Sequence, residues 1–198
     1  MPKCYSEQEK EYIKNRLQKE AAKCLAKYGI RRTTVDELVK RVKIPKGTFY
    51  LFYESKEQLL FEVILEQHEQ VEQELFAAMQ SLEQTSITCD TVTDVLFLFY
   101  KKAEEMPILN MIQSGEVELL FRKLPPAVVE QHLKEDDSMV EKVFGVLPVK
   151  KEVDAKAVSA AFHAIYYATL HKEEIGEKNY DEALRLLIRG LVMQFLEK

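Results

Sequence analysis

Apolar residues recur at helical spacing along almost the whole chain, and no other feature constrains its fold as much. The first such run extends from about Ser6 to Tyr28, with apolar residues at Ile13, Leu17, Ala21, Cys24, Leu25 and Tyr28. No stretch alternates polar and apolar residues for long enough to predict a strand, and only 6 Gly and 6 Pro interrupt the 198 residues. We therefore predict an all-α protein.

Capping residues and helix breakers divide this pattern into separate helices. Gly29 is placed to end the first helix, and Thr34 with Glu37 forms a capping-box pattern at the start of the second. Pro45 suits the first turn of a third helix, and Ser55 is placed to cap a fourth. The predicted helices span residues 6–28, 34–41, 45–53, 55–82, 91–105, 108–122, 126–145, 154–173 and 181–197.

The second and third predicted helices are short and are separated by a tight turn. Two such helices form a helix-turn-helix, which places its second helix in the major groove of DNA. Lysines and hydroxyl groups bind phosphates, and side chains on the exposed face of the second helix read base edges. Lys46, Thr48, Tyr50 and Leu51 have the chemistry for these contacts. A small core is expected from Val35, Leu38, Val39, Val42, Ile44 and Phe49.

The charge of the chain is divided between its two ends. Residues 1–60 carry 14 Lys and Arg against 8 Asp and Glu, whereas residues 61–198 carry 14 against 25. The first segment, with a net charge of +6, is suited to approach a polyanion, and the acidic remainder is not. The alternative interpretation is that this difference in net charge is chance variation among surface residues.

The segment LAKYGIRRTTVDELVKRVKIPKGTFYLFYESKEQLL resembles the DNA-binding domain of the tetracycline-repressor (TetR) family of bacterial transcription regulators. The matching motifs are Tyr28-Gly29, Thr33-Thr34, Lys46-Gly47-Thr48-Phe49-Tyr50 and Lys56, in the order and spacing of that family. The resemblance implies that Thr33 or Thr34, Tyr50 and Lys56 hold phosphates. It also implies that Lys46, Gly47, Thr48 and Leu51 face bases or the adjacent phosphates.

Two positions depart from the family pattern. Lys43 stands in the turn where the family usually has Gly, so this lysine is expected to adopt a left-handed backbone or to alter the turn. Pro45 stands where the family often has Ser, and it removes one amide donor near the start of the recognition helix.

The resemblance divides the chain into two parts. Residues 1–54 are predicted to be a three-helix DNA-binding domain, and residues 55–198 a larger helical ligand-binding and dimerisation domain. The helix at 154–173 is apolar on nearly all sides, and the helix at 181–197 has an apolar stripe, so the two are predicted to form a four-helix bundle in a homodimer. The alternative is that these two helices pack within the core of a single chain. The interface residues are predicted to be Ala161, Ala164, Ala168, Leu184, Leu187, Leu191 and Phe195.

Aromatic and methionine side chains in the second part are candidates for a small-molecule pocket, although each taken singly is more typical of a core. The predicted pocket residues are Phe97, Tyr100, Met111, Phe121, Phe162, His163 and Tyr166. Ligand sites are mostly apolar with a few polar groups, and the Tyr hydroxyls and His163 are the polar candidates here.

The preferred hypothesis is a ligand-responsive repressor that a small, mostly apolar molecule releases from a pseudo-palindromic operator. The alternatives are a small helical enzyme and a DNA-binding architectural protein without a ligand. The chain has no GxSxG, phosphate-binding loop or GxGxxG motif, so no catalytic residues are predicted. The acidic remainder disfavours an architectural protein.

Metal ligation, a cofactor and membrane insertion are not predicted. The four histidines lack ligand spacing, the three cysteines form no CxxC pair, and no apolar run approaches the roughly 20 residues that cross a bilayer. The N-terminus has no apolar signal segment. We therefore expect a cytoplasmic protein whose partners are double-stranded operator DNA, a small-molecule effector and a second copy of the chain.

Overall fold

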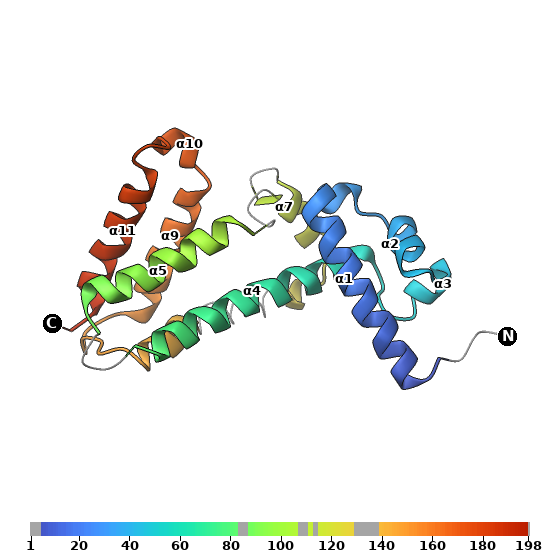
Figure 1. Ribbon diagram of the computed structural model, residues 1–198, viewed down its shortest axis with the longest axis horizontal. Coiled ribbons are helices and arrows are strands. Elements are labelled where there is room, and N and C mark those ends of the chain that lie inside the picture. The colour runs from blue at the N-terminus through green and yellow to red at the C-terminus, as the bar shows by residue number, and fades with distance from the viewer. Residues whose placement is uncertain (1–4, 83–86, 107–110, 113–114, 129–138, 198) are drawn as a thin grey trace. The chain divides into compact units, whose positions relative to one another are not determined.

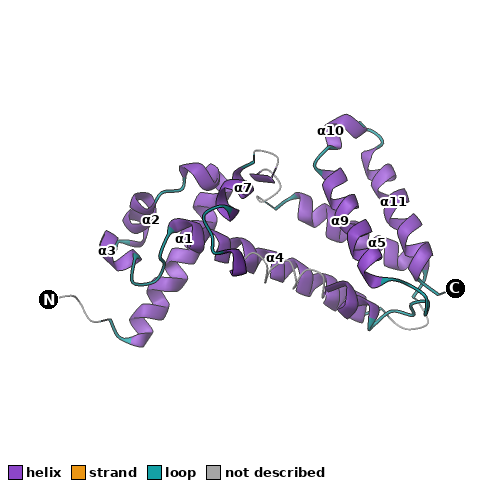
Figure 2. Cartoon of the chain, turned by 180° about the vertical axis from the view of Figure 1, so that it is seen from behind, coloured by secondary structure: helices purple, strands orange, loops and turns teal. Residues whose placement is uncertain are grey.

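The computed structural model describes residues 5–82, 87–106, 111–112, 115–128 and 139–197. Within these ranges the regular structure is helical, and the only strand-like pairing is an isolated bridge between Val149 and Leu196. The prediction of an all-α fold is therefore confirmed. The helices are α1 (Glu7–Arg32), α2 (Val35–Val42), α3 (Lys46–Phe49), α4 (Lys56–Gln80), α5 (Cys89–Glu104), α7 (Glu116–Phe121), α9 (Ala155–Thr169), α10 (Lys172–Ile175) and α11 (Tyr180–Phe195) (Figures 1 and 2).

The chain forms two compact units. The first contains residues 1–68 and 110–126, and the second contains residues 69–109 and 127–198. Helix α4 contributes its first half to one unit and its second half to the other. A functional boundary between residues 54 and 55 stays a prediction.

Helix α1 begins where the sequence indicates, because Ser6 and Glu9 cap its first turn reciprocally. Of its predicted apolar residues, Tyr28 is half-buried and the others are buried: Ile13, Leu17, Ala21, Cys24 and Leu25. The predicted end at residue 28 is only partly right: Gly29 interrupts the helix with φ +72°, and one further turn then extends to Arg32. The Ile30 amide at the start of this turn donates to Glu116, and the Thr33 carbonyl at its end accepts from Lys56, so the helix continues past the break.

The next two helices have the predicted order but different lengths. The Thr34 side chain accepts a hydrogen bond from the amide of Glu37 and starts α2. Lys43 then adopts a left-handed backbone with φ 62°, which confirms that a lysine occupies the turn position where glycine would be least strained. Helix α3 spans only Lys46–Phe49, shorter than the predicted 45–53, because Pro45 precedes it as the N-cap and tight turns follow it.

The start of α4 was also predicted from its cap. The Ser55 hydroxyl accepts a hydrogen bond from the amide of Gln58 at 3.2 Å. The helix places Leu59, Leu60 and Val63 in the core of the first unit and Leu75 and Met79 in the core of the second.

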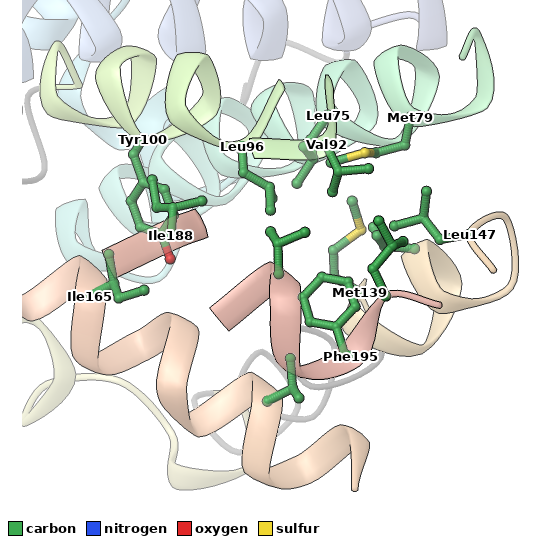
Figure 3. Close-up of a cluster of buried hydrophobic side chains, with 14 of the residues drawn as sticks. Leu75, Met79, Val92, Leu96, Tyr100, Met139, Leu147, Ile165, Ile188 and Phe195 are labelled. Carbon is green, nitrogen blue, oxygen red and sulfur yellow. The ribbon is translucent and has the colours of Figure 1, made fainter. Parts of the chain in front are cut away.

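The second unit is built on a broad apolar core between the end of α4 and helices α5, α9 and α11. Figure 3 shows Leu75, Met79, Val92, Leu96 and Tyr100 on one side of this core, facing Ile165, Ile188 and Phe195 on the other. Three ion pairs join the exposed edges of α5 and α11 in antiparallel register: Asp90 with Arg189, Asp94 with Arg185, and Lys101 with Asp181.

Several helix limits in the second half differ from the sequence prediction. The helix predicted at 154–173 ends at Thr169, and a separate short helix, α10, follows. The last helix begins at Tyr180 and ends at Phe195, close to prediction. The helix predicted at 108–122 is described chiefly as α7, and much of the one predicted at 126–145 and of the loop at 84–90 lies outside the described residues.

Candidate nucleic-acid interface

Helix α3 has a buried side and an exposed side. The Phe49 ring is fully buried and contacts the rings of Tyr50 and Tyr53, with centroid distances of 5.3 and 5.9 Å. Tyr50, which caps the end of α3, is 53% exposed, and Leu51 in the turn after it is 69% exposed. Burial of Phe49 therefore presents Tyr50 and Leu51 to solvent. The predicted aromatic core residue and the two predicted contact residues lie on the expected sides.

The exposed side of α3 continues through its first turn. No atom lies within 4 Å of the position that a Cβ on Gly47 would occupy, so another molecule can approach the backbone there. The adjacent Lys46 ammonium lies 2.9 Å from an Asp36 carboxylate oxygen on α2. This hydrogen bond, and then the charge of Asp36, raise the pKa of Lys46. Asp36 is a neighbour that the sequence analysis did not single out.

Thr48 occupies the buried side of α3, with only 7% of its surface exposed. Its hydroxyl lies 3.2 Å from the hydroxyl of Tyr5, within hydrogen-bonding distance. The Tyr5 side chain therefore lies against Thr48, and sequence reasoning missed this residue. The only signal in the sequence for this contact is that Tyr5, an aromatic residue, directly precedes the Ser6 cap. A contact between Thr48 and DNA stays a prediction.

The two predicted phosphate-binding threonines have different environments. Thr34 is exposed and caps α2, whereas Thr33 is fully buried and donates its hydroxyl proton to the Gly29 carbonyl at 2.7 Å. Of the two alternatives, Thr34 is the one that is accessible to a phosphate.

Lys56 holds the end of α1 in the described structure. Its ammonium donates to the carbonyls of Ile30 and Thr33, both at 2.7 Å. Burial lowers the pKa of Lys56. The Lys56 side chain thereby satisfies carbonyl groups that the helix end leaves without intrahelical partners. Its predicted contact with phosphate would have to be added to these bonds or to replace them.

Helix α7 provides a hydrogen-bond acceptor for the start of the last turn of α1, which follows Gly29. The Glu116 carboxylate accepts a hydrogen bond from the Ile30 amide at 2.6 Å. A Cβ on Gly29 would lie 2.7 Å from the same carboxylate oxygen, so any other residue here would have to displace the end of the Glu116 side chain. Near the other end of α7, Lys123 pairs with Glu57 at 2.8 Å. Both contacts hold the first unit together.

Further cations surround the helix-turn-helix, and they fall into two groups. Arg41 is paired with Glu37 at 2.6 Å and with Glu20 at 3.6 Å. Arg32, Lys40 and Lys43 are exposed, and no carboxylate in the described part of the chain lies within ion-pair distance of them. Sequence reasoning missed these three as candidate phosphate contacts, although their charge and position near the motif were visible.

The predicted pocket residues are distributed over both units. Met111 and Phe121 belong to the first unit, where Phe121 packs edge-on against Phe61. The other five belong to the second unit. There the buried Tyr100 hydroxyl donates to the Phe162 carbonyl at 2.8 Å, and burial raises the pKa of Tyr100.

The remaining pocket candidates differ in exposure. Phe162 and Tyr166 are half-buried against the core of the second unit, and His163 is exposed. The Phe97 ring lies beneath the Arg185 guanidinium, 4.5 Å from its centroid. A ligand site formed by these residues stays a prediction.

The predicted dimer residues also divide into two groups. Leu184 and Phe195 are buried in the core of their own chain, whereas Ala161, Ala168 and Leu191 are half-buried. Ala164 and Leu187 are exposed, Leu187 by 51%. Their exposed neighbours on α9 and α11 include Tyr167, Leu186, Gly190 and Met193.

Among the residues that the structure describes, no group of three or more His, Cys, Asp or Glu side chains is arranged to hold a metal ion. No helix in the described ranges is long and apolar enough to cross a membrane.

Comparison with known proteins gives a family and a set of similar structures. Residues 17–63 match the family described as bacterial regulatory proteins, tetR family. No curated protein matches the chain at a significant level. A TetR-family transcription regulator from Marinobacter aquaeolei has a TM-score of 0.57 and 14% identity, with 98% of this chain and 100% of that chain covered.

Two further solved structures resemble the chain over most of its length. A TetR transcriptional regulator from Chloroflexus aurantiacus gives a TM-score of 0.58 at 21% identity, with 94% of this chain and 98% of that one covered. SmeT, the repressor of the Stenotrophomonas maltophilia multidrug efflux pump SmeDEF, gives 0.59 at 14% identity, with 93% and 91% covered. At these identities the likeness concerns the fold.

The matched segment contains the capped α2, the left-handed turn at Lys43 and the whole of α3. Solved regulators of that family share the all-helical fold of this chain over most of its length. Residues 17–63 therefore belong to the TetR family of bacterial regulatory proteins, and the chain has the fold of transcription regulators of that family.

Proposed function

We propose that this regulator is a repressor that binds a pseudo-palindromic operator as a homodimer and is released by a small, mostly apolar molecule. We further infer that it acts in the cytoplasm, without a cofactor or enzymatic activity of its own. The observation that carries the proposal is the exposed surface of α3 and of the turn after it, where Lys46, Tyr50 and Leu51 are exposed beside the buried Phe49.

DNA binding is expected to use this side of α3 together with Thr34 and the exposed cations near the motif. Lysine ammonium groups and hydroxyl groups bind phosphates, and the first side chains of a recognition helix contact base edges. The net charge of +6 on residues 1–60 favours approach to DNA, and the net charge of −11 on residues 61–198 does not. Thr48 and Lys56 would contribute after changing their present contacts.

The test is titration of duplex DNA from upstream of the protein's own gene, over a range of salt concentrations. The logarithm of affinity should fall linearly with the logarithm of salt concentration, with a slope of about −0.9 per phosphate contacted. Lys46→Ala should weaken binding to this DNA, whereas Lys178→Ala, which removes an exposed cation outside the motif, should not. Absence of binding to any upstream duplex at low salt contradicts the proposal.

Dimerisation is expected to use the exposed apolar side chains of α9 and α11. Leu187 and its neighbours Leu186 and Met193 are exposed in the single chain, although side chains of this size are more often buried. The small Ala164 and Gly190 permit close approach of a second helix pair. Leu184 and Phe195 would support this surface from beneath rather than form it.

The dimer can be tested with two leucines of similar exposure. Leu187→Arg would bury an unpaired charge at the interface and should yield monomers that bind the operator poorly. The matched control is Leu98→Arg on α5, where the leucine is 66% exposed, and this variant should remain dimeric. A wild-type monomer in sedimentation at micromolar concentration would refute the arrangement.

Effector binding is expected in the second unit, among Phe97, Tyr100, Phe162, His163 and Tyr166. SmeT, which shares the fold, has been solved as a complex with triclosan. Triclosan is therefore a sensible first probe for calorimetry, with and without operator DNA. If ligand releases the repressor, operator must weaken ligand binding by the same factor, typically about 5–150-fold. Equal ligand affinities in the two titrations would contradict the coupling.

A further inference from the structure

We propose that Asp36 is a positioning residue for Lys46: it holds the ammonium group toward the base edges and keeps it from serving as a phosphate contact. The inference deepens the proposed function and rests on it. It assigns sequence discrimination to an acidic residue within a basic DNA-binding surface. It also gives a role to the pairing of Lys46, which contrasts with Lys40 and Lys43, for which the described residues provide no carboxylate within ion-pair distance.

The pair links the first turns of two helices. Asp36 lies two residues after the Thr34 cap of α2, where a carboxylate is favoured by the helix dipole. Lys46 begins α3, and its ammonium lies 2.9 Å from Asp36. Val39 and Phe49 are buried, and the Ile44 amide donates to the Val39 carbonyl at 3.0 Å, so the turn between the two helices is held from both sides.

Both partners remain accessible to another molecule. The side chains of Lys46 and Asp36 are 52% and 74% exposed. An ammonium group has three donors, so one bond to Asp36 leaves two for other acceptors. A lysine that reads guanine contacts O6 and N7, which are two acceptors on one base edge. Lys46 can therefore retain Asp36 while it contacts a base.

The paired state has a second consequence for binding to arbitrary DNA. Phosphate contacts depend on net charge and release of counterions, and they are independent of sequence. The Asp36 carboxylate neutralises Lys46 at short range, so the pair gains little from a nearby phosphate. Lys40 and Lys43, which have no such carboxylate in the described structure, are left to supply the sequence-independent part of the affinity.

Removal of the Asp36 charge should therefore affect random DNA most. In Asp36→Asn, Lys46 gains freedom to neutralise a phosphate, and the salt slope on random-sequence duplex should steepen by about 0.9. If one contact contributes nothing near 1 M salt, this corresponds to a gain in affinity of about eightfold near 0.1 M salt. Affinity for the duplex that the wild-type protein selects from a randomised pool should not rise, so discrimination should fall by about the same factor.

Three further variants separate this role from a general effect of charge. Asp36→Glu keeps the carboxylate and should behave like the wild type. Glu54→Gln removes one exposed negative charge close to the motif but away from Lys46, and it should leave the salt slope unchanged. In the Lys46→Ala background, Asp36→Asn should no longer raise affinity for random DNA, because the residue through which it acts is absent.

The outcomes distinguish this inference from the proposed function. If the wild type binds no duplex at low salt, both are wrong. If the wild type binds and Asp36→Asn leaves the salt slope on random DNA unchanged, only this inference is overturned. It is also overturned if the gain persists on Lys46→Ala, or if affinity for the selected duplex rises in parallel. Circular dichroism at the assay temperature checks that every variant is folded.

Discussion

The two compact units of this chain position their functional helices by different means. In the first, α3 has only four residues, and its place depends on the buried Phe49, the Thr34 cap and contacts from neighbouring segments. In the second, α11 has sixteen residues and is held by a continuous apolar core with three ion pairs along its edge. An isolated helix of four residues is not stable in water, so α3 exists only because of its surroundings.

This difference predicts where each unit is sensitive to substitution. The second unit should respond mainly to loss of apolar volume. The first unit should respond to loss of backbone geometry and of single polar contacts, even at positions with little buried area. The following substitutions compare the two, from the largest expected effect to the smallest.

Ile188→Ala should produce the largest loss of stability. Ile188 is fully buried between α5 and α9, and removal of its side chain leaves a cavity in the core. Such truncations cost about 2–5 kcal/mol in free energy of unfolding. Urea unfolding followed by circular dichroism measures the change. Leu98→Ala, on the exposed side of α5 and outside the proposed dimer surface, is the control and should change stability by less than about 0.5 kcal/mol.

Gly29→Ala tests the backbone geometry of the first unit. The residue has φ +72° and ψ −175°, a region that side chains rarely adopt, and its new Cβ would displace the Glu116 carboxylate. We expect a loss of about 1–3 kcal/mol from backbone strain, with weaker DNA binding. Gly190→Ala in α11 is the contrasting substitution. It has open space and a helical environment, so it should stabilise the single chain by about 0.5–1 kcal/mol.

Two buried tyrosines separate hydrogen bonding from burial. The Tyr180 hydroxyl donates to Glu104 at 2.6 Å, whereas the buried Tyr53 hydroxyl lies near the Glu62 carboxylate without a hydrogen bond of standard geometry in the described structure. Tyr180→Phe should therefore cost about 1.5–3 kcal/mol, the range for bonds to charged groups. Tyr53→Phe should be close to neutral in the same unfolding experiment. Equal losses for the two variants would contradict this assignment.

The smallest effect concerns alkaline pH. Burial raises the pKa of Tyr100 above its value in the unfolded chain, so the unfolded state loses this proton first. Its contribution to stability is present below about pH 10 and is lost as pH rises above that value. Unfolding titrations should show a fall in stability there. The fall should be shallower for Tyr100→Phe, and an unchanged profile would show that this hydroxyl does not contribute.

The sequence allowed most of the local structure of the first unit to be predicted. Thr34, Ser55 and Gly29 gave the starts of α2 and α4 and the break in α1, because caps and glycine act on backbone groups a few residues away. The motif around Lys46 gave the family for the same reason: its residues are consecutive in the chain. The predicted α3 was too long because Pro45 acts as a cap rather than as a helical residue and because turns follow Phe49.

Contacts between distant residues could not be predicted in this way. Glu116 and Ile30 are 86 residues apart, and Tyr5 and Thr48 are 43 apart. The sequence also could not show that Leu184 faces its own core while Leu187 faces solvent, because both lie in the same apolar stripe.

The sequence by itself determined an all-helical chain, the order of its helices and a DNA-binding motif with specific residue types. Only the tertiary structure decided which of those residues are accessible: Tyr50 and Leu51 are exposed, Thr33 and Thr48 are buried, and Lys46 is paired with Asp36. Helix periodicity and caps are local properties, and a short stretch of chain encodes them. Accessibility and pairing depend on which distant segments pack together, and that is settled when the whole chain buries its apolar surface.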